Sequence, residues 1–253
     1  MSGRYVALGS SMAAGPGIRP KADGAPAGSG RSAVNYPHLV ARRLGHHLVD
    51  VTFSGATTAH VLTERQRHAQ PQIDAIDGSE DLVTITIGGN DAGYVPMLYA
   101  AGLPRLLRSL PVVGSKLREL LDPAARDTAL AQVADSLITV GREVRRRAPR
   151  ARVLFVDYLT LLPPPGTSAP FPSADLAAAR HVADTLKRHT EAAAAATGCE
   201  LVRAADASVD HHPWSNDPWT SGLGLPLPGR PAPLHPNAAG MRAVADLVVA
   251  ALT

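Results

Sequence analysis

Short, nearly continuous apolar runs recur along the chain, and longer segments with helical spacing of apolar residues separate them. Strands buried on both faces typically have such runs, whereas a half-exposed strand alternates apolar and polar positions. Glycine, serine or aspartate follows most of the runs, as expected at strand ends. The pattern therefore predicts five β-strands, at residues 5–8, 48–53, 82–87, 152–158 and 200–202.

Segments with helical periodicity lie between these runs. Asp122 before Pro123 is typical of a helix start, and this helix is expected to run to Arg147; Ser173 is expected to cap another, which Gly198 closes. Strands that alternate with helices predict a parallel sheet covered on both faces, a three-layer α/β/α sandwich. We find no internal repeat or linker, so residues 1–253 are expected to form one domain. The other expected helices cover residues 36–44, 64–76 (where Pro71 is a potential interruption) and the segment after Pro236.

Three stretches fit no regular element, namely residues 15–32, 161–172 and 206–234. Loops of this length inside a compact domain are usually functional or mobile. The third stretch contains both tryptophans, Trp214 and Trp219, which either attach the loop to the core or line a substrate pocket.

Composition and charge restrict the class of protein. The chain is 45% hydrophobic and 19% charged, which is typical of a globular protein, and no run approaches the roughly 18 to 20 apolar residues of a membrane span. The net charge is only +3, and the run 145–147 lies at an expected helix end, so no nucleic-acid partner is expected. Cys199 is the sole cysteine, and a strand beginning near Tyr5 leaves no room for a signal peptide; both features predict a cytoplasmic location.

Polar residues and glycines follow the first three predicted strands, at the sheet edge where parallel sheets bind ligands. Ser11 follows the first strand, Gly55 the second and Asn90 the third, while His235 precedes the last helix. A serine hydroxyl needs a base to become a nucleophile, and the oxyanion that its attack creates needs preplaced donors. We therefore expect Ser11 as nucleophile, His235 as base, and the Ser11 and Gly55 N–H groups with the Asn90 amide as an oxyanion hole.

These ordered blocks resemble the SGNH (GDSL-type) hydrolase superfamily over nearly the whole chain. In that family the blocks carry a nucleophilic serine, a glycine, a Gly-x-Asn-Asp motif and a histidine, which fall here on Ser11, Gly55, Asn90 and His235. The resemblance implies a flavodoxin-like sandwich with a five-stranded parallel sheet, and an acyl-enzyme formed on Ser11. It implies no cofactor.

Two positions depart from the family pattern. Ser10 stands where the family usually has an aspartate, which suggests altered support for the nucleophile turn. The triad acid of the family lies three residues before the histidine, and here that position is Ala232. Because some members orient the histidine through a main-chain carbonyl, the Ala232 carbonyl is one candidate for this role, and Asp210 and Asp217 are the others.

Other polar residues have more than one interpretation. Asp91 either caps the helix that starts there or contributes to substrate binding. The pairs His46-His47 and His211-His212 resemble metal ligands, but adjacent residues on a strand point to opposite faces, so no metal site is expected.

The partner that receives the acyl group decides the activity. Water makes the enzyme an esterase, whereas a sugar or glycerol hydroxyl makes it an acyltransferase. Residues 4–17 are similar to the mycobacterial member of the family assigned to octanoylation in methylglucose lipopolysaccharide biosynthesis, which implies a medium-chain acyl donor and a glucosylglycerate-type acceptor.

Two further segments have two interpretations each. Arg19, Lys21 and Arg31 either bind a carboxylate or phosphate or are simply solvated. The leucine-rich residues 98–121 form either an apolar flap over the acyl chain or ordinary core.

Two other functions fit part of the pattern. A non-catalytic flavodoxin-like module can hold a phosphate ligand at its first turn, but this leaves Asn90 and His235 without roles. A phosphodiesterase is the second of these functions.

Secreted esterases and lipases similar to this chain usually have several cysteines, often including the position of Phe53, so the chain resembles an intracellular relative.

Overall fold

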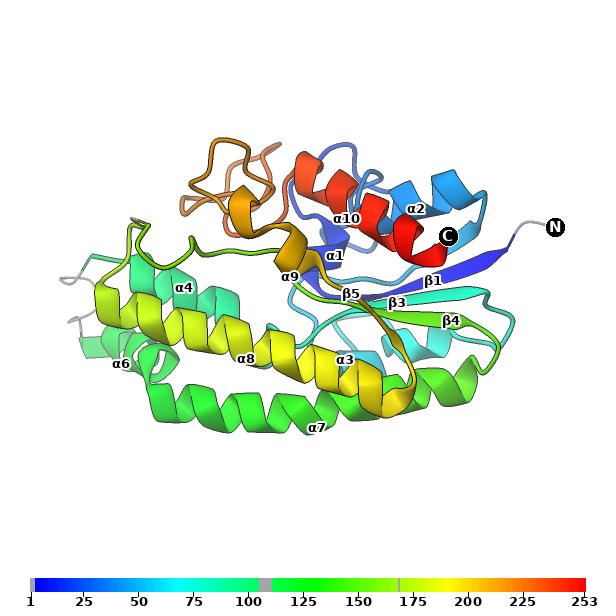
Figure 1. Ribbon diagram of the computed structural model, residues 1–253, viewed down its shortest axis with the longest axis horizontal. Coiled ribbons are helices and arrows are strands. Elements are labelled where there is room, and N and C mark those ends of the chain that lie inside the picture. Colours follow the sequence, from blue (N-terminus) through cyan, green and yellow to red (C-terminus); the bar gives the residue numbers. More distant parts are fainter. Residues whose placement is uncertain (1–2, 105–110, 168) are drawn as a thin grey trace.

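The computed structural model describes residues 3–104, 111–167 and 169–253. Five strands form a parallel sheet in the order β2-β1-β3-β4-β5 (Figure 1). This confirms the predicted α/β sandwich with flavodoxin-like strand order. The strands are β1 (Arg4–Gly9), β2 (His47–Asp50), β3 (Leu82–Thr86), β4 (Arg152–Val156) and β5 (Glu200–Val202).

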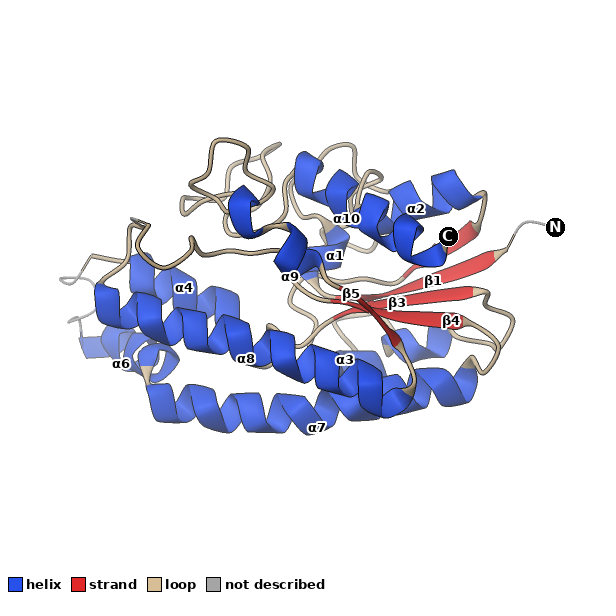
Figure 2. Ribbon diagram, viewed as in Figure 1, coloured by secondary structure: helices blue, strands red, loops and turns tan. Residues whose placement is uncertain are grey.

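Helices cover both faces of the sheet, as Figure 2 shows. Side chains of β1 alternate between the two cores: Tyr5 and Ala7 pack toward α2 and α10, whereas Val6 and Leu8 pack toward α3, α7 and α8. Both faces are apolar because both are covered. The helices are α1 (Ser11–Ala14), α2 (Tyr36–Leu44), α3 (Thr58–Leu62), η1 (Gln72–Ala75), α4 (Tyr94–Gly102), α6 (Pro111–Leu121), α7 (Pro123–Arg147), α8 (Ser173–Thr197), α9 (Ala204–Ala207), η2 (Val209–His211) and α10 (Ala238–Leu252).

Most predicted helix ends have a local chemical cause. The Asp122 carboxylate accepts a hydrogen bond from the Ala124 N–H at 3.2 Å, and the helix that it caps ends at Arg147 as predicted. Gly198 closes α8 in a left-handed conformation. Ser173, in contrast, is the first helical residue and not the cap, since Pro172 occupies the cap position.

The helix predicted over residues 64–76 is wrong. The chain there forms α3, an irregular segment and the short 3₁₀ helix η1, which begins after Pro71. A proline disfavours helix in the residue before it and lacks the N–H that a continuing helix needs. Arg67 also has a positive φ of 56°, which no α-helix contains.

The leucine-rich region contains α4 and α6, and residues 105–110 lie outside the described residues. Leu98 is fully buried in the core, so this residue has a packing role and not that of a flap. In the part of the chain that the structure describes, every helix is too short or too polar to cross a bilayer.

Candidate active site

The first strand ends at a tight turn that leads into the short helix α1. A Cβ on Gly9 would lie only 2.7 Å from the Thr86 carbonyl oxygen, so glycine is needed for this close approach of β1 to β3. The buried Gln72 side chain donates to the Gly9 carbonyl at 3.0 Å and accepts from the Gly9 N–H at 2.7 Å. These contacts fix the backbone just before Ser11, the first residue of α1.

Ser11 and His235 meet although 224 positions separate them in the chain. The Ser11 Oγ lies 2.8 Å from the His235 Nε2, within hydrogen-bond distance of a base that accepts the hydroxyl proton. Ser11 is buried and His235 is partly buried. The arrangement has the geometry of an activated serine.

A main-chain carbonyl orients the imidazole, and it belongs to Pro233. The His235 Nδ1 lies 2.7 Å from the Pro233 oxygen, which fixes the tautomer with the proton on Nδ1 and leaves Nε2 free to accept. The expectation that the Ala232 carbonyl does this is wrong by one residue. Leu234, between the two residues, adopts a left-handed conformation with φ of 57°, and in this turn the Pro233 carbonyl lies within hydrogen-bond distance of the His235 Nδ1.

The two alternative acids do not hold His235 in this structure. The Asp217 carboxylate lies 3.3 Å from the His211 Nδ1, and its carbonyl accepts from the same atom at 2.7 Å. Asp210 is exposed on η2. Among the described residues, the Nδ1 of His235 has a carbonyl partner and no carboxylate partner.

Sequence reasoning missed a second donor to the same carbonyl. The Tyr99 hydroxyl, on α4, donates to the Pro233 oxygen at 3.2 Å. Burial raises the pKa of Tyr99 above its ordinary value, so the phenol remains a donor at neutral pH. The Leu234 N–H on the other side of the peptide donates to the Ser221 and Gly222 carbonyls. The peptide that orients His235 is therefore held from both sides.

The pKa of His235 suits a general base. Burial lowers it from the ordinary value, and the hydrogen bond to the Pro233 carbonyl partly opposes this effect. The imidazole is therefore neutral at pH 7, with Nε2 able to take a proton.

The predicted oxyanion donors come from three separate segments, namely the start of α1 and the loops that follow β2 and β3. Among the described residues, neither the Ser11 N–H nor the Gly55 N–H has a hydrogen-bond acceptor, so both remain available to a ligand. Gly55 has a φ of 80°, which favours glycine there. The Asn90 Nδ2 donates one hydrogen to the Ala56 carbonyl at 2.8 Å, which places the amide and leaves its second hydrogen unused.

Comparisons with known proteins identify the family of the chain. Residues 7–243 match the GDSL-like Lipase/Acylhydrolase family. The chain belongs to this family. Lipase 2 of Streptomyces coelicolor is 34% identical over 253 residues, which cover 96% of this chain and 83% of that protein. The family membership makes this protein an enzyme of the serine ester hydrolase type.

Solved structures of lipases share the fold over the full length. An extracellular lipase from Streptomyces rimosus superposes with a TM-score of 0.80 at 26% identity, covering 99% of this chain and 100% of that one. A phospholipase A1 from Streptomyces albidoflavus gives a TM-score of 0.77 at 25% identity, with 99% of both chains covered.

In this GDSL-family chain, Asp91 caps a helix other than the predicted one. Its carboxylate accepts from the Thr58 N–H at 3.0 Å and from the Thr58 hydroxyl at 2.6 Å, at the start of α3. The helix that follows Asp91 begins only at Tyr94, with Gly93 at its cap. Asp91 thus ties the loop after β3 to the loop that carries Gly55, and its predicted contribution to substrate binding stays a prediction.

Ser10, which replaces the usual aspartate of the family, supports the nucleophile turn through Tyr158. The Tyr158 hydroxyl lies 3.1 Å from the Ser10 Oγ and accepts from the Gly89 N–H at 3.0 Å. One partly buried tyrosine therefore joins the residue before Ser11 to the residue before Asn90. Nothing in the local sequence around position 158 indicates this contact.

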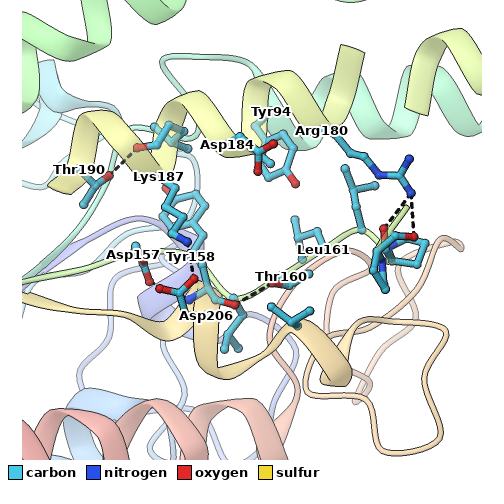
Figure 3. A pocket seen from close by; sticks show the side chains of 18 of the residues that line it. Tyr94, Asp157, Tyr158, Thr160, Leu161, Arg180, Asp184, Lys187, Thr190 and Asp206 are labelled. Atoms are coloured by element: carbon cyan, nitrogen blue, oxygen red, sulfur yellow. Dashed lines mark hydrogen bonds and ion pairs between the residues drawn. The ribbon is translucent and has the colours of Figure 1, made fainter. Parts of the chain in front are cut away.

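Tyr158 also forms a wall of an apolar cavity of about 260 Å³ between α8 and residues 157–165 (Figure 3). The view shows Asp184 and Lys187 of α8 facing this segment, with the Lys187 ammonium paired to Asp206. Neither Ser11 nor His235 lines the cavity. It is therefore separate from the reacting groups, although it shares Tyr158 with them.

Trp219 stacks on a residue of its own loop, whereas Trp214 contacts a different loop. The Trp219 and His211 ring centroids lie 3.8 Å apart, and the Trp214 and Phe171 rings form a T-shaped pair with centroids 5.6 Å apart. Neither lines the cavity of Figure 3. Their predicted role in substrate binding stays a prediction. Within the described ranges, no cluster of His, Cys, Asp and Glu side chains could hold a metal ion.

Proposed function

We propose that the protein hydrolyses carboxylic esters through an acyl-enzyme on Ser11, with His235 as the general base. The observation that carries this proposal is the 2.8 Å distance between the Ser11 Oγ and the His235 Nε2, with Nδ1 of the same ring held by a carbonyl. A phosphate-binding module would not require this pairing.

The reaction proceeds in two halves. His235 Nε2 takes the Ser11 proton as Oγ attacks the ester carbonyl carbon, and the oxyanion accepts hydrogen bonds from the N–H groups of Ser11 and Gly55 and from the Asn90 amide. The tetrahedral intermediate collapses as His235 returns the proton to the leaving alcohol oxygen. Water then enters, gives a proton to His235 and attacks the acyl carbon. His235 returns this proton to the Ser11 Oγ as the bond between Oγ and the acyl carbon breaks, which releases the carboxylic acid.

The Pro233 carbonyl replaces the usual triad acid in this scheme. While His235 carries two protons, its Nδ1–H donates to the Pro233 oxygen. A carbonyl dipole stabilises the imidazolium less than a carboxylate does, but it holds the ring in the same orientation. The positioning by Tyr99 and Leu234 compensates in part, because no reorganisation of the carbonyl is needed during the reaction.

We further propose medium-chain acyl esters as substrates, with transfer of an octanoyl group to a glucosylglycerate-type hydroxyl as a second outcome of the same acyl-enzyme. The similarity of residues 4–17 to an octanoyltransferase supports the transfer. Trp214, Trp219 and Asp91 are proposed to contribute to substrate binding. The relatives named lipase and phospholipase A1 support lipid esters as substrates.

We also propose that residues 1–253 act as one domain in the cytoplasm. The location is supported by Cys199, which is half-buried, has no cysteine partner and has a thiol pKa raised by burial. A chain with a single cysteine forms no internal disulfide, so its fold does not depend on an oxidising compartment. Fractionation of the native host tests this, and recovery of the protein outside the cells would contradict it.

The function is tested with p-nitrophenyl esters of increasing chain length, supplied with and without glucosylglycerate. We expect hydrolysis with a maximum at medium chain length, and a loss of about 10⁶-fold in kcat in both Ser11→Ala and His235→Ala. Mass spectrometry distinguishes octanoate from octanoylated sugar. Free acid at every acceptor concentration would refute the transfer, and wild-type activity of Ser11→Ala would refute the acyl-enzyme.

A further inference from the structure

A second cavity, of about 520 Å³, lies between the first long loop and the loop that leads to His235. Its walls come from residues 16–31, from Ser54 and from residues 227–229. Arg19, Lys21 and Arg31 are the charged residues that line it. The cavity contains none of the groups that the mechanism uses.

The loops that supply the catalytic groups also form the walls of this cavity. Pro16 follows α1, the helix that begins with Ser11, and its carbonyl accepts from the Ala232 N–H at 2.9 Å. Ser54 directly precedes Gly55, so their Cα atoms are about 3.8 Å apart. One wall of the cavity is therefore formed by the residue next to an expected oxyanion donor. The position suits a part of the substrate other than the reacting carbonyl.

The charge in the cavity is positive and one of its cations is fixed. Arg31 is mostly buried, and its Nε donates to the Thr52 carbonyl at 2.7 Å, with the Asp50 carboxylate at 4.0 Å. Among the described residues, its Nη atoms have no hydrogen-bond partner. Burial lowers the pKa of Arg31, but arginine remains charged at neutral pH.

Arg19 and Lys21 are exposed at the same cavity, and no described carboxylate forms an ion pair with either. Asp23 is the sole acid in residues 15–32, and it does not line the cavity. The Asp50 carboxylate faces Arg31, but Arg19 and Lys21 have no such partner among the described residues, and two cations at one hollow repel each other unless an anion compensates them. A planar guanidinium that is already held in place is suited to a carboxylate or phosphate.

We infer that this cavity binds an oxyanion, carboxylate or phosphate, carried by the alcohol part of the substrate or by the acyl acceptor. The role of the anion as part of the substrate or acceptor rests on the proposed acyl transfer at Ser11. The binding of the anion itself does not depend on that chemistry. The enzyme accordingly prefers esters with an anionic alcohol part over neutral esters of the same acyl chain. Tighter binding of a phosphate would identify a lipid headgroup as the source of the anion, whereas tighter binding of a carboxylate would identify a sugar acid.

Binding is measured by calorimetry on the full-length Ser11→Ala variant with sn-glycerol 3-phosphate, D-glycerate and glycerol. We expect at least one anion to bind and glycerol not to bind. The double variant Arg19→Gln/Lys21→Gln should weaken anion binding about tenfold, which corresponds to the loss of one charged hydrogen bond. Binding should also weaken with added NaCl, because the exposed charges are screened.

The matched control is Arg142→Gln/Arg242→Gln, which removes the same charge from exposed positions on α7 and α10. It should bind the anions as Ser11→Ala does. The single variant Lys21→Glu provides a second test, with a larger loss than neutralisation. Equal binding by all variants, or no binding of either anion, would overturn the inference.

A catalytic comparison separates this inference from the proposed function. The wild type should have a KM about tenfold lower for 1-octanoylglycerol 3-phosphate or octanoylglycerate than for 1-octanoylglycerol, and Arg19→Gln/Lys21→Gln should abolish the difference. Absence of all ester hydrolysis, with intact anion binding by the cavity, would refute the acyl-enzyme and leave the anion site standing. Hydrolysis without any preference for the anionic esters would refute the anion site alone.

Discussion

Replacing Tyr99 by phenylalanine removes one donor from the carbonyl that orients His235 and keeps the aromatic ring in α4. The Pro233 oxygen accepts hydrogen bonds from Tyr99 at 3.2 Å and from His235 at 2.7 Å. The first holds the carbonyl in place, and the second orients the catalytic base. Without the phenol, this oxygen is held only through its own peptide, whose Leu234 N–H stays bonded to Ser221 and Gly222. The imidazole should then deviate more often from the orientation that Ser11 requires.

The size of the effect follows from the chemistry of this contact. It is a hydrogen bond between two neutral groups, worth about 0.5 to 1.5 kcal/mol. If the loss of this free energy raises the activation barrier by the same amount, kcat falls between about twofold and about twelvefold. The KM should stay unchanged, because the 3.2 Å contact lies within the protein and not at the ester.

Two assays distinguish positioning from a general loss of stability. Steady-state kinetics on a p-nitrophenyl ester give kcat and KM separately, and the rate of fluorophosphonate labelling of Ser11 reports its activation without ester binding. Both kcat and the labelling rate should fall by the same factor in Tyr99→Phe. The control is Tyr94→Phe, on the same helix, because within the described ranges the Tyr94 hydroxyl makes no hydrogen bond to Pro233. A kcat within experimental error of the wild type, or an equal fall in Tyr94→Phe, would refute the positioning role.

Three further predictions concern titratable groups. His235→Ala should abolish turnover while Asp210→Asn and Asp217→Asn keep most of it; a comparable loss in either aspartate variant would show that a carboxylate orients the ring. In the pH profile of kcat/KM, the midpoint of the acid limb should lie below the ordinary histidine pKa, since burial lowers the pKa of His235. A midpoint above the ordinary value would contradict the assignment of His235 as the base. Burial raises the pKa of Asp157 from 3.8 to about 6. Protonated Asp157 therefore favours the folded state, and this contribution to stability is lost as the pH rises through about 6. In urea titrations, the unfolding free energy of the wild type should fall between pH 4 and pH 8 by up to about 3 kcal/mol relative to that of Asp157→Asn. A difference independent of pH would refute this.

The fold was predictable where local signals agree with the tertiary structure. The helix from Pro123 to Arg147 has its own cap and ends before Pro149, and β5 has the predicted bounds. The segment 64–76 was not predictable in the same way, because its apolar residues suit a helix while Pro71 prevents one. The 3₁₀ helix η1 there places Gln72 against Gly9, a contact across 63 positions that helical periodicity does not encode.

The candidate site was predictable as a set of positions and not as a set of contacts. Ser11, Asn90 and His235 follow strands or precede a helix, and parallel strands bring such positions to one edge of the sheet. The identity of the orienting carbonyl depends on the backbone of Leu234, whose positive φ is uncommon for a leucine and has no local sequence signal.

By itself, the amino-acid sequence determined the order of strands and helices and the chemical groups available at the strand ends, because apolar periodicity, caps and turn residues act over a few neighbouring positions. Only the tertiary structure decided that Pro233 holds His235, that Tyr99 holds Pro233, and that Tyr158 joins Ser10 to Gly89. These hydrogen bonds require angstrom-scale placement of groups from separate elements. That placement results from the packing of the whole sheet and its loops, which no short segment specifies.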